Sequence, residues 1–181
     1  YKVSVKELEQ LTSNITSKPL HVFKVDKVRY SSRWGEVRYA AWNGFVEASA
    51  QVPLFVNKGG VGKLNVYSDG GILLYSDDIN LDNGLNYVNY NMTINSDKLA
   101  AFNKELKKAK KGNQEGLNKK ADDNFYLIPG EYKVEIAVND QKAAGSLIVE
   151  EARRRPSRGA RGSRAAAGSA RRATRPRPTD R

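Results

Sequence analysis

The residues whose spacing comes closest to a recognisable chemical site run from 58 to 63, as Lys-Gly-Gly-Val-Gly-Lys. A phosphate-binding loop uses glycine backbone N–H groups and a Lys to hold phosphates, and a Ser or Thr directly after that Lys holds Mg²⁺. In this chain Leu64 follows Lys63, and Asn57 stands where the first glycine belongs. The metal-binding hydroxyl is therefore missing.

The residues after this loop predict a strand, whereas a phosphate loop needs the N-terminus of a helix at that point. Leu64 and Val66 alternate with Asn65 and Tyr67, and Ser-Asp-Gly-Gly at 68–71 is a turn before a second apolar run. Two such runs around a short Asp-Gly linker are typical of a β-hairpin. The glycines are thus predicted to form a loop between strands, and no nucleotide or other cofactor is expected.

Histidine and cysteine chemistry is restricted by composition, since the chain has one histidine, His21, and no cysteine. Disulfides, thiolate catalysis and the usual zinc ligand sets are excluded on that basis. A Ser-His-Asp triad would have to use His21, and no nucleophile motif accompanies it. We therefore interpret His21 as a structural residue.

Acidic residues also suggest a metal site at first sight, because Asp78, Asn80 and Asp82 alternate as at the start of an EF-hand loop. The glycine comes one place late, at Gly84, and Asn89 replaces the bidentate Glu that closes such a loop. A polar turn between strands is the prediction here, and no metal ligands are assigned.

Exposed aromatic rings are the remaining candidates for binding, because tryptophan and tyrosine faces can hold pyranose rings. Trp34, Trp42 and Tyr39 are the ligand-binding candidates, and polysaccharide is the ligand class that they suggest. Within a β-sandwich, however, tryptophan also serves as a core residue, so both interpretations stay open. No catalytic residues are assigned, and the chain is not expected to be an enzyme.

The net charge of +11 belongs mostly to the segment 151–181, which has eleven Arg and two acidic residues. This segment contains no aromatic residue and no Leu, Ile or Val. It is predicted to be disordered because it cannot bury a core. Two interpretations stay open: a foreign, vector-encoded or frame-shifted tail, or a basic arm that binds anions or nucleic acid through residues such as Arg153, Arg154 and Arg155.

Residues 20–150 alternate apolar and polar side chains over many short runs separated by turn residues, which predicts an all-β sandwich. The segment 132–138 is the clearest strand, because every second residue from Tyr132 to Val138 is apolar. The predicted strands cover residues 22–30, 36–42, 46–56, 63–68, 72–76, 84–94, 132–138 and 146–149.

Two segments have a helical period. A short helix is predicted over 4–12, within a linker at 1–19. A Lys-rich helix is predicted over 95–113, where Leu99, Phe102 and Leu106 share one face, and it belongs to a helical insertion at 95–124. No run of apolar residues is long enough to cross a membrane.

Four segments together resemble one family, and they are residues 19–35, 63–76, 83–92 and 126–151. In order they are similar to the C-terminal region of secreted bacterial sortilin-like β-propeller proteins, which are described as glycosyl-hydrolase-like. The similarity includes the Asn-Val-Tyr-Ser-Asp-Gly-Gly hairpin, the Gly-Leu-Asn strand and the Pro-Gly-Glu-Tyr strand start. The first residue, Tyr1, fits a processed product or a fragment.

The resemblance implies an immunoglobulin-like antiparallel β-sandwich over 20–150 and an exported, extracellular or cell-surface parent. It implies a non-catalytic accessory module that packs on, or positions, the β-propeller of the same parent chain. Carbohydrate binding by exposed aromatics, and anion or nucleic-acid binding by the Arg-rich tail, are the alternatives.

Overall fold

The computed structural model describes residues 5–39, 42, 44–108 and 117–152, and this part of the chain is all-β with few helices. The coarse fold-class prediction is therefore confirmed. No helix within these ranges is both long enough and apolar enough to span a bilayer. The strands are β1 Leu20–Val22, β2 Val28–Arg29, β3 Ala50–Val56, β4 Gly60–Ser68, β5 Leu73–Leu81, β6 Gly84–Tyr90, β7 Thr93–Ile94, β8 Phe125–Tyr126, β9 Gly130–Val138 and β10 Gln141–Glu150.

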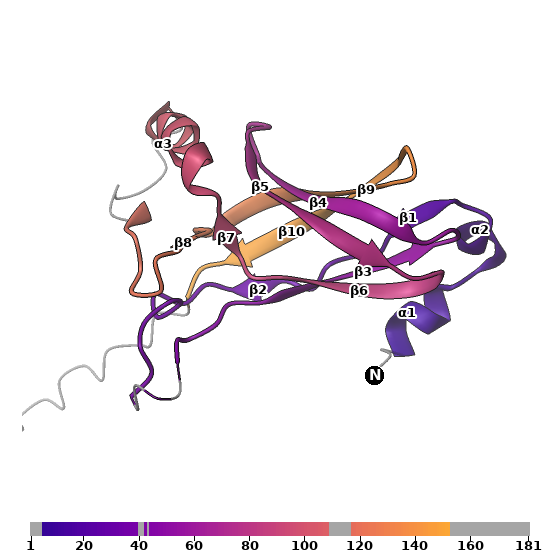
Figure 1. Cartoon of the computed structure of the whole chain (residues 1–181), viewed down its shortest axis with the longest axis horizontal. Coiled ribbons are helices and arrows are strands. Elements are labelled where there is room, and N and C mark those ends of the chain that lie inside the picture. Colours follow the sequence, from indigo (N-terminus) through magenta and orange to yellow (C-terminus); the bar gives the residue numbers. More distant parts are fainter. Residues whose placement is uncertain (1–4, 40–41, 43, 109–116, 153–181) are drawn as a thin grey trace, which may run out of the picture.

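The strands form two main sheets, with orders β1-β3-β6 and β2-β10-β9-β4-β5, and β7 pairs with β8 in a small third sheet. The pairs are antiparallel except for β2 and β10, which run parallel. The helices, α1 Val5–Gln10, α2 Ser13–Thr16, η2 Ser96–Lys98 and α3 Leu99–Lys108, lie at the ends of the sheets. In Figure 1, α1 and α2 lie at one end, and α3 lies at the other end with β7 and β8.

One hydrophobic core lies between the two main sheets, because every second residue of the central strands points inward. Val52 and Leu54 of β3 are fully buried from one sheet, and Val66 of β4 and Val134 and Ile136 of β9 are fully buried from the other. These side chains belong to a single buried cluster. The period of two predicted for 132–138 is confirmed, since β9 covers that whole segment.

Buried hydroxyl groups in this core find backbone acceptors. Tyr132, near the start of β9, donates from its hydroxyl to the carbonyl oxygen of Ile128 at 2.8 Å. Tyr90 of β6 donates to the carbonyl oxygen of Thr93 at 2.6 Å. Burial raises the pKa of both phenols above the ordinary value. They therefore stay protonated at neutral pH and can donate these hydrogen bonds.

The structure corrects four predicted strands. The strand predicted over 84–94 divides into β6 and β7, which belong to different sheets. Residues 22–30 do not form one strand: β1 pairs with β3, the chain then leaves that sheet, and β2 pairs with β10 of the other sheet. Among the described residues of 36–42, Val37 forms an isolated bridge and no strand is present, and the strand predicted over 46–56 begins only at Ala50. Local alternation was present in all four segments, but tertiary pairing determines where a strand exists.

The hairpin predicted around 68–71 is confirmed, because β4 and β5 pair antiparallel across this turn. The predicted helices are also present in the described residues, as α1 and α3, and residues 109–113 of the second lie outside them. Phe102 of α3 is buried, and Leu99 and Leu106 pack against the core. Helix α2, within the expected linker, was not predicted.

Helix α3 is joined to the β4–β5 turn by Glu105. One carboxylate oxygen accepts a hydrogen bond from the Ser68 hydroxyl at 2.6 Å, and the other accepts from the Gly70 N–H at 3.0 Å. Ser68 is buried, and its hydroxyl also accepts from the Ile72 N–H at 3.0 Å. A Cβ on Gly70 would lie 2.7 Å from the Glu105 carboxylate, so a larger residue there would displace this carboxylate from its present position.

We expect Glu105→Ala to lower the free energy of unfolding by about 1–3 kcal/mol, because it leaves the buried Ser68 hydroxyl and the Gly70 N–H without this acceptor. Lys104→Ala, one residue earlier on the exposed side of α3, is the matched control and should stay within about 0.5 kcal/mol of the parent. Urea denaturation followed by circular dichroism measures both. Equal stabilities for the two variants would contradict the role given to Glu105.

Candidate binding surface on an aromatic hairpin

Residues 36–39 and 44–46 form the two arms of a hairpin that projects from the sheets at the end where β7 and β8 lie (Figure 1), and we call these arms, together with Trp42, the aromatic hairpin. Val37 and Phe45 form an antiparallel bridge. The Arg38 N–H donates to the Gly44 carbonyl oxygen at 3.0 Å, and the Arg38 Nε donates to the Phe45 carbonyl oxygen at 2.8 Å. These contacts join the two described arms of the hairpin, although the arms lie outside the main sheets.

The aromatic hairpin exposes large apolar side chains. Trp42 is 88% exposed and Tyr39 is fully exposed, and Val37 and Phe45 are about half exposed. Exposed apolar groups gathered on one element are typical of a contact surface, whereas single ones are common on any protein. Tyrosine and tryptophan suit such a surface, because an apolar ring carries a polar group that can stay hydrated.

Trp34, the third aromatic candidate, lies at the base of the hairpin and is only 5% exposed. Its ring packs edge-on against Tyr30, with 5.3 Å between ring centroids, and lies 6.0 Å from the ring of Tyr126. Trp34 is therefore a core residue here, and its ring faces are not open to a ligand. Of the three predicted residues, the structure brings Tyr39 and Trp42 together on the aromatic hairpin.

Gly35 fixes the hairpin to the rest of the molecule. Its φ of +72° favours glycine, and its N–H donates to the Val46 carbonyl oxygen at 2.8 Å. A Cβ at this position would lie 2.5 Å from a carboxylate oxygen of Asp122 and 2.7 Å from the Tyr126 ring. The segment that leads into β8 thus lies directly against the base of the hairpin.

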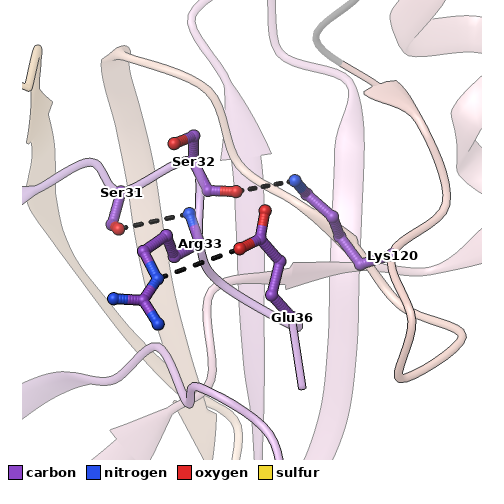
Figure 2. Close-up of polar contacts among 5 residues, drawn as sticks. All are labelled: Ser31, Ser32, Arg33, Glu36 and Lys120. Atoms are coloured by element: carbon purple, nitrogen blue, oxygen red, sulfur yellow. Dashed lines mark hydrogen bonds and ion pairs between the residues drawn. The ribbon is translucent and has the colours of Figure 1, made fainter. Parts of the chain in front are cut away.

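Polar contacts at the base of the hairpin lie within residues 31–36 and between these residues and Lys120 (Figure 2). The Lys120 ammonium group donates to the Ser32 carbonyl oxygen at 2.7 Å. The Ser31 hydroxyl accepts from the Arg33 N–H at 3.3 Å. Arg33 and Glu36 lie 3.9 Å apart and are largely exposed, so this ion pair adds little stability. The hydrogen bond from Lys120 to Ser32 is therefore the contact in this group that joins residues distant in sequence.

Asp122 completes the base by accepting hydrogen bonds from the Tyr126 hydroxyl and from Asn124. Burial opposes the charged form of Asp122, but these hydrogen bonds outweigh it and keep its pKa below the ordinary value. Burial, and next the hydrogen bond to Asp122, raise the pKa of Tyr126. The pair therefore stays a carboxylate and a neutral phenol at neutral pH, which favours the hydrogen bond.

The Lys58–Lys63 segment does not have the surroundings of a phosphate loop. Strand β4 begins at Gly60, so Lys63 lies within a strand and pairs with Asp78 at 3.3 Å. The Gly59 N–H donates to the Asn83 side-chain oxygen at 2.6 Å, and a Cβ on Gly59 would lie 2.3 Å from the Leu81 carbonyl oxygen. Gly59 lies in the loop between β3 and β4, as predicted, and allows close approach of the β5–β6 turn, whereas Gly60 and Gly62 lie within β4.

The structure also locates the remaining residues that the sequence analysis considered, except those of the tail. His21 lies in β1 with its ring edge-on to Phe23 at 4.9 Å, and burial, followed by the charge of Lys18, lowers its pKa. Asp78 lies in β5. In the described ranges, no three His, Cys, Asp or Glu residues are placed to hold a metal ion. Arg153, Arg154 and Arg155 lie outside the described residues.

Sequence reasoning did not assign Val37 and Phe45 to the candidate surface. A signal for them was present, because Val37 and Tyr39 alternate within the segment 36–42. That alternation was interpreted as a strand with a buried face. In the described part of the hairpin, Val37 pairs with Phe45 of the second arm and neither belongs to a main sheet, so both apolar side chains stay partly exposed.

Comparison with known proteins gives no family. No family model matches the chain, and no curated protein matches it. Among solved structures, a β-glucosidase from Listeria innocua in complex with isofagomine aligns at 12% identity and a TM-score of 0.28. The novel β-glucosidase EmGH1 from Erythrobacter marinus aligns at 9% identity and a TM-score of 0.27. The alignments cover 72% and 71% of this chain but 16% and 15% of those chains, and at such TM-scores they support no argument.

We expect Gly35→Ala to destabilise the protein more than Gly44→Ala. Both glycines have φ near +70°, which costs an L-residue about 1–2 kcal/mol. Gly44 has open space around it, so Gly44→Ala adds no contact, whereas Gly35→Ala forces a Cβ into Asp122 and Tyr126. That overpacking adds about 1–3 kcal/mol. Thermal and urea unfolding measure the difference, and equal losses would show that the base of the hairpin is not tightly packed.

Proposed function

We propose that this chain is a non-catalytic accessory module of a larger exported protein and that the aromatic hairpin is its contact surface. The observation that carries the proposal is the gathering of Val37, Tyr39, Trp42 and Phe45 on an element that projects from an all-β body. The ordered base formed by Gly35 and Asp122 reduces the entropy that such a surface would lose on binding.

The module is proposed to be an immunoglobulin-like sandwich. Two features support this finer assignment. The two main sheets, with strand orders β1-β3-β6 and β2-β10-β9-β4-β5, contribute to one buried cluster, as the two sheets of that sandwich do. The hydrogen bond from the Tyr132 hydroxyl to the Ile128 carbonyl matches the tyrosine corner of that fold, which also stands at the start of a central strand.

The proposed partner is a β-propeller of the same parent chain. This choice rests on the resemblance of residues 19–35, 63–76, 83–92 and 126–151 to the C-terminal region of sortilin-like β-propeller proteins. Export of the parent to the cell surface or beyond is part of the same proposal. An exposed apolar hairpin suits contact with a neighbouring domain, because that contact would bury apolar surface that otherwise faces water.

Carbohydrate binding by the hairpin is the second candidate function. The exposure of the Tyr39 and Trp42 rings favours it, because CH groups of a pyranose can pack on such rings. Anion or nucleic-acid binding by the Arg-rich tail remains a sequence-based proposal, since that segment lies outside the described residues.

If the main proposal holds, the natural gene encodes a β-propeller in frame before codon 1, and this propeller binds the purified chain in trans. Tyr39→Ser combined with Trp42→Ser should weaken that binding by at least about tenfold, because both large exposed apolar contacts are removed. Val61→Ser is the matched control, since Val61 is an exposed apolar residue of β4 away from the hairpin. Isothermal titration calorimetry measures the affinities. A gene that begins at codon 1, or unchanged binding by the double variant, would contradict the proposal.

Tryptophan fluorescence separates the second candidate from the first. Trp42 is exposed and Trp34 is buried, so a polysaccharide bound at the hairpin should shift the emission of Trp42. Trp42→Phe keeps an aromatic ring but removes that signal, which provides the control. Emission that stays flat across a panel of polysaccharides would rule out the hairpin as a sugar site.

A further inference from the structure

The outer face of the five-stranded sheet carries a groove that is separate from the aromatic hairpin. The register of the sheet places polar side chains there in rows that run across the strands. Tyr67 of β4 lies opposite Lys133 of β9, which lies opposite Ser146 of β10. In the next row, Glu135 of β9 lies between Asn65 of β4 and Ala144 of β10.

Small residues allow this groove to form. Its volume is about 680 Å³, and it extends from the β4–β5 turn across β9 to β10. Ala144 and Ser146 contribute short side chains along β10, and Gly71 contributes none at the turn. Tyr67 lines the groove beside them. A space of this size is comparable to the pockets that bind small ligands.

Three charged groups of the groove, Glu135, Lys133 and Lys142, lie close together. Glu135 has a side chain that is only 15% exposed, and it lies 3.5 Å from the Lys133 ammonium group and 3.9 Å from that of Lys142. Burial raises the pKa of Tyr67, and the charge of Glu135 and a hydrogen bond with it raise it further. Lys133 also lies over the Tyr67 ring, with its nitrogen 5.7 Å from the centroid.

The groove thus offers donors and acceptors side by side with little net charge. Its lining includes the carboxylates of Asp69, Glu131 and Glu135 and the ammonium groups of Lys133 and Lys142. A strongly anionic ligand such as nucleic acid would meet three carboxylates. A ligand with many neutral hydroxyls could accept from the lysines and donate to the carboxylates, while its CH groups pack against an aromatic ring.

We propose that this groove binds a neutral oligosaccharide. The sugar ring packs against Tyr67, and its hydroxyls bond to Glu135 and the lysines beside it. The proposal stands on the outer sheet face alone and does not depend on the aromatic hairpin. The module would thus have two separate contact sites, one for a neighbouring domain at the hairpin and one for a glycan on the outer face of the sheet.

The test uses four neutral probes, cellohexaose, maltohexaose, xylohexaose and mannohexaose, with hexagalacturonate as an anionic comparison. Each is titrated into the ¹⁵N-labelled full chain, and the backbone amide shifts are followed by NMR. We expect at least one neutral probe to shift amides of β4, β9 and β10 with millimolar or tighter affinity, and hexagalacturonate to bind more weakly. The Tyr67→Ala variant should weaken the binding by at least about tenfold.

Tyr39→Ala on the hairpin is the matched control and should leave the affinity for the neutral probe unchanged. Ala144→Leu fills the groove from an exposed sheet position, so it should abolish binding even if Tyr67→Ala does not fold. The proposal is overturned if no neutral probe shifts these amides, if hexagalacturonate binds more tightly, or if the shifts fall on the hairpin. If the hairpin double variant still binds the propeller normally but a neutral probe binds at the groove, the proposed domain contact is overturned and the proposed oligosaccharide site is retained.

Discussion

The position of β9 between β10 and β4 is the constraint on which most of the structure depends. It pairs antiparallel with both neighbours, so its backbone is hydrogen-bonded along both edges. Its inward residues, Val134 and Ile136 among them, are fully buried and belong to the common core. The same period sends Lys133 and Glu135 to the outer face. A shift of one residue in this strand would exchange the two sets, losing both the core and the groove.

The proposed contact surface on the aromatic hairpin arises where the chain departs from that regular sheet. Between β1 and β3 the chain crosses from one sheet to the other and extends the aromatic hairpin beyond both. Its two described arms are supported at the base, where Gly35, Asp122 and Tyr126 are in close contact. This arrangement combines exposed apolar residues with two arms joined by hydrogen bonds. Such a combination favours binding, because less conformational freedom is lost when a partner arrives.

The sequence predicted the parts of the fold that local pattern determines. Strand β9, the hairpin of β4 and β5, and helix α3 each have a clear period bounded by turn or capping residues. The strand predicted over 22–30 was wrong because nothing local indicates that β1 and β2 belong to different sheets. Pairing partners far along the chain decide that point, and sequence periodicity does not contain them.

The candidate surfaces show the same limit. Tyr39, Trp42 and Trp34 were indistinguishable as aromatic residues in one segment, and only packing against Tyr30 and Tyr126 removes Trp34 from the exposed set. The groove was not predicted, because Tyr67 and Ser146 become neighbours of Lys133 only through the register of three strands. Composition does indicate that the body is nearly neutral once the eleven arginines of the tail are set apart.

Hydrogen–deuterium exchange at the aromatic hairpin tests the central claim most directly. The comparison is between the isolated chain and the natural protein in which the proposed β-propeller precedes it. If the hairpin is the contact surface, backbone amides within residues 36–46 exchange at least about tenfold more slowly in the longer protein, while those of β9 do not change. Equal exchange of the hairpin in both proteins would contradict the account.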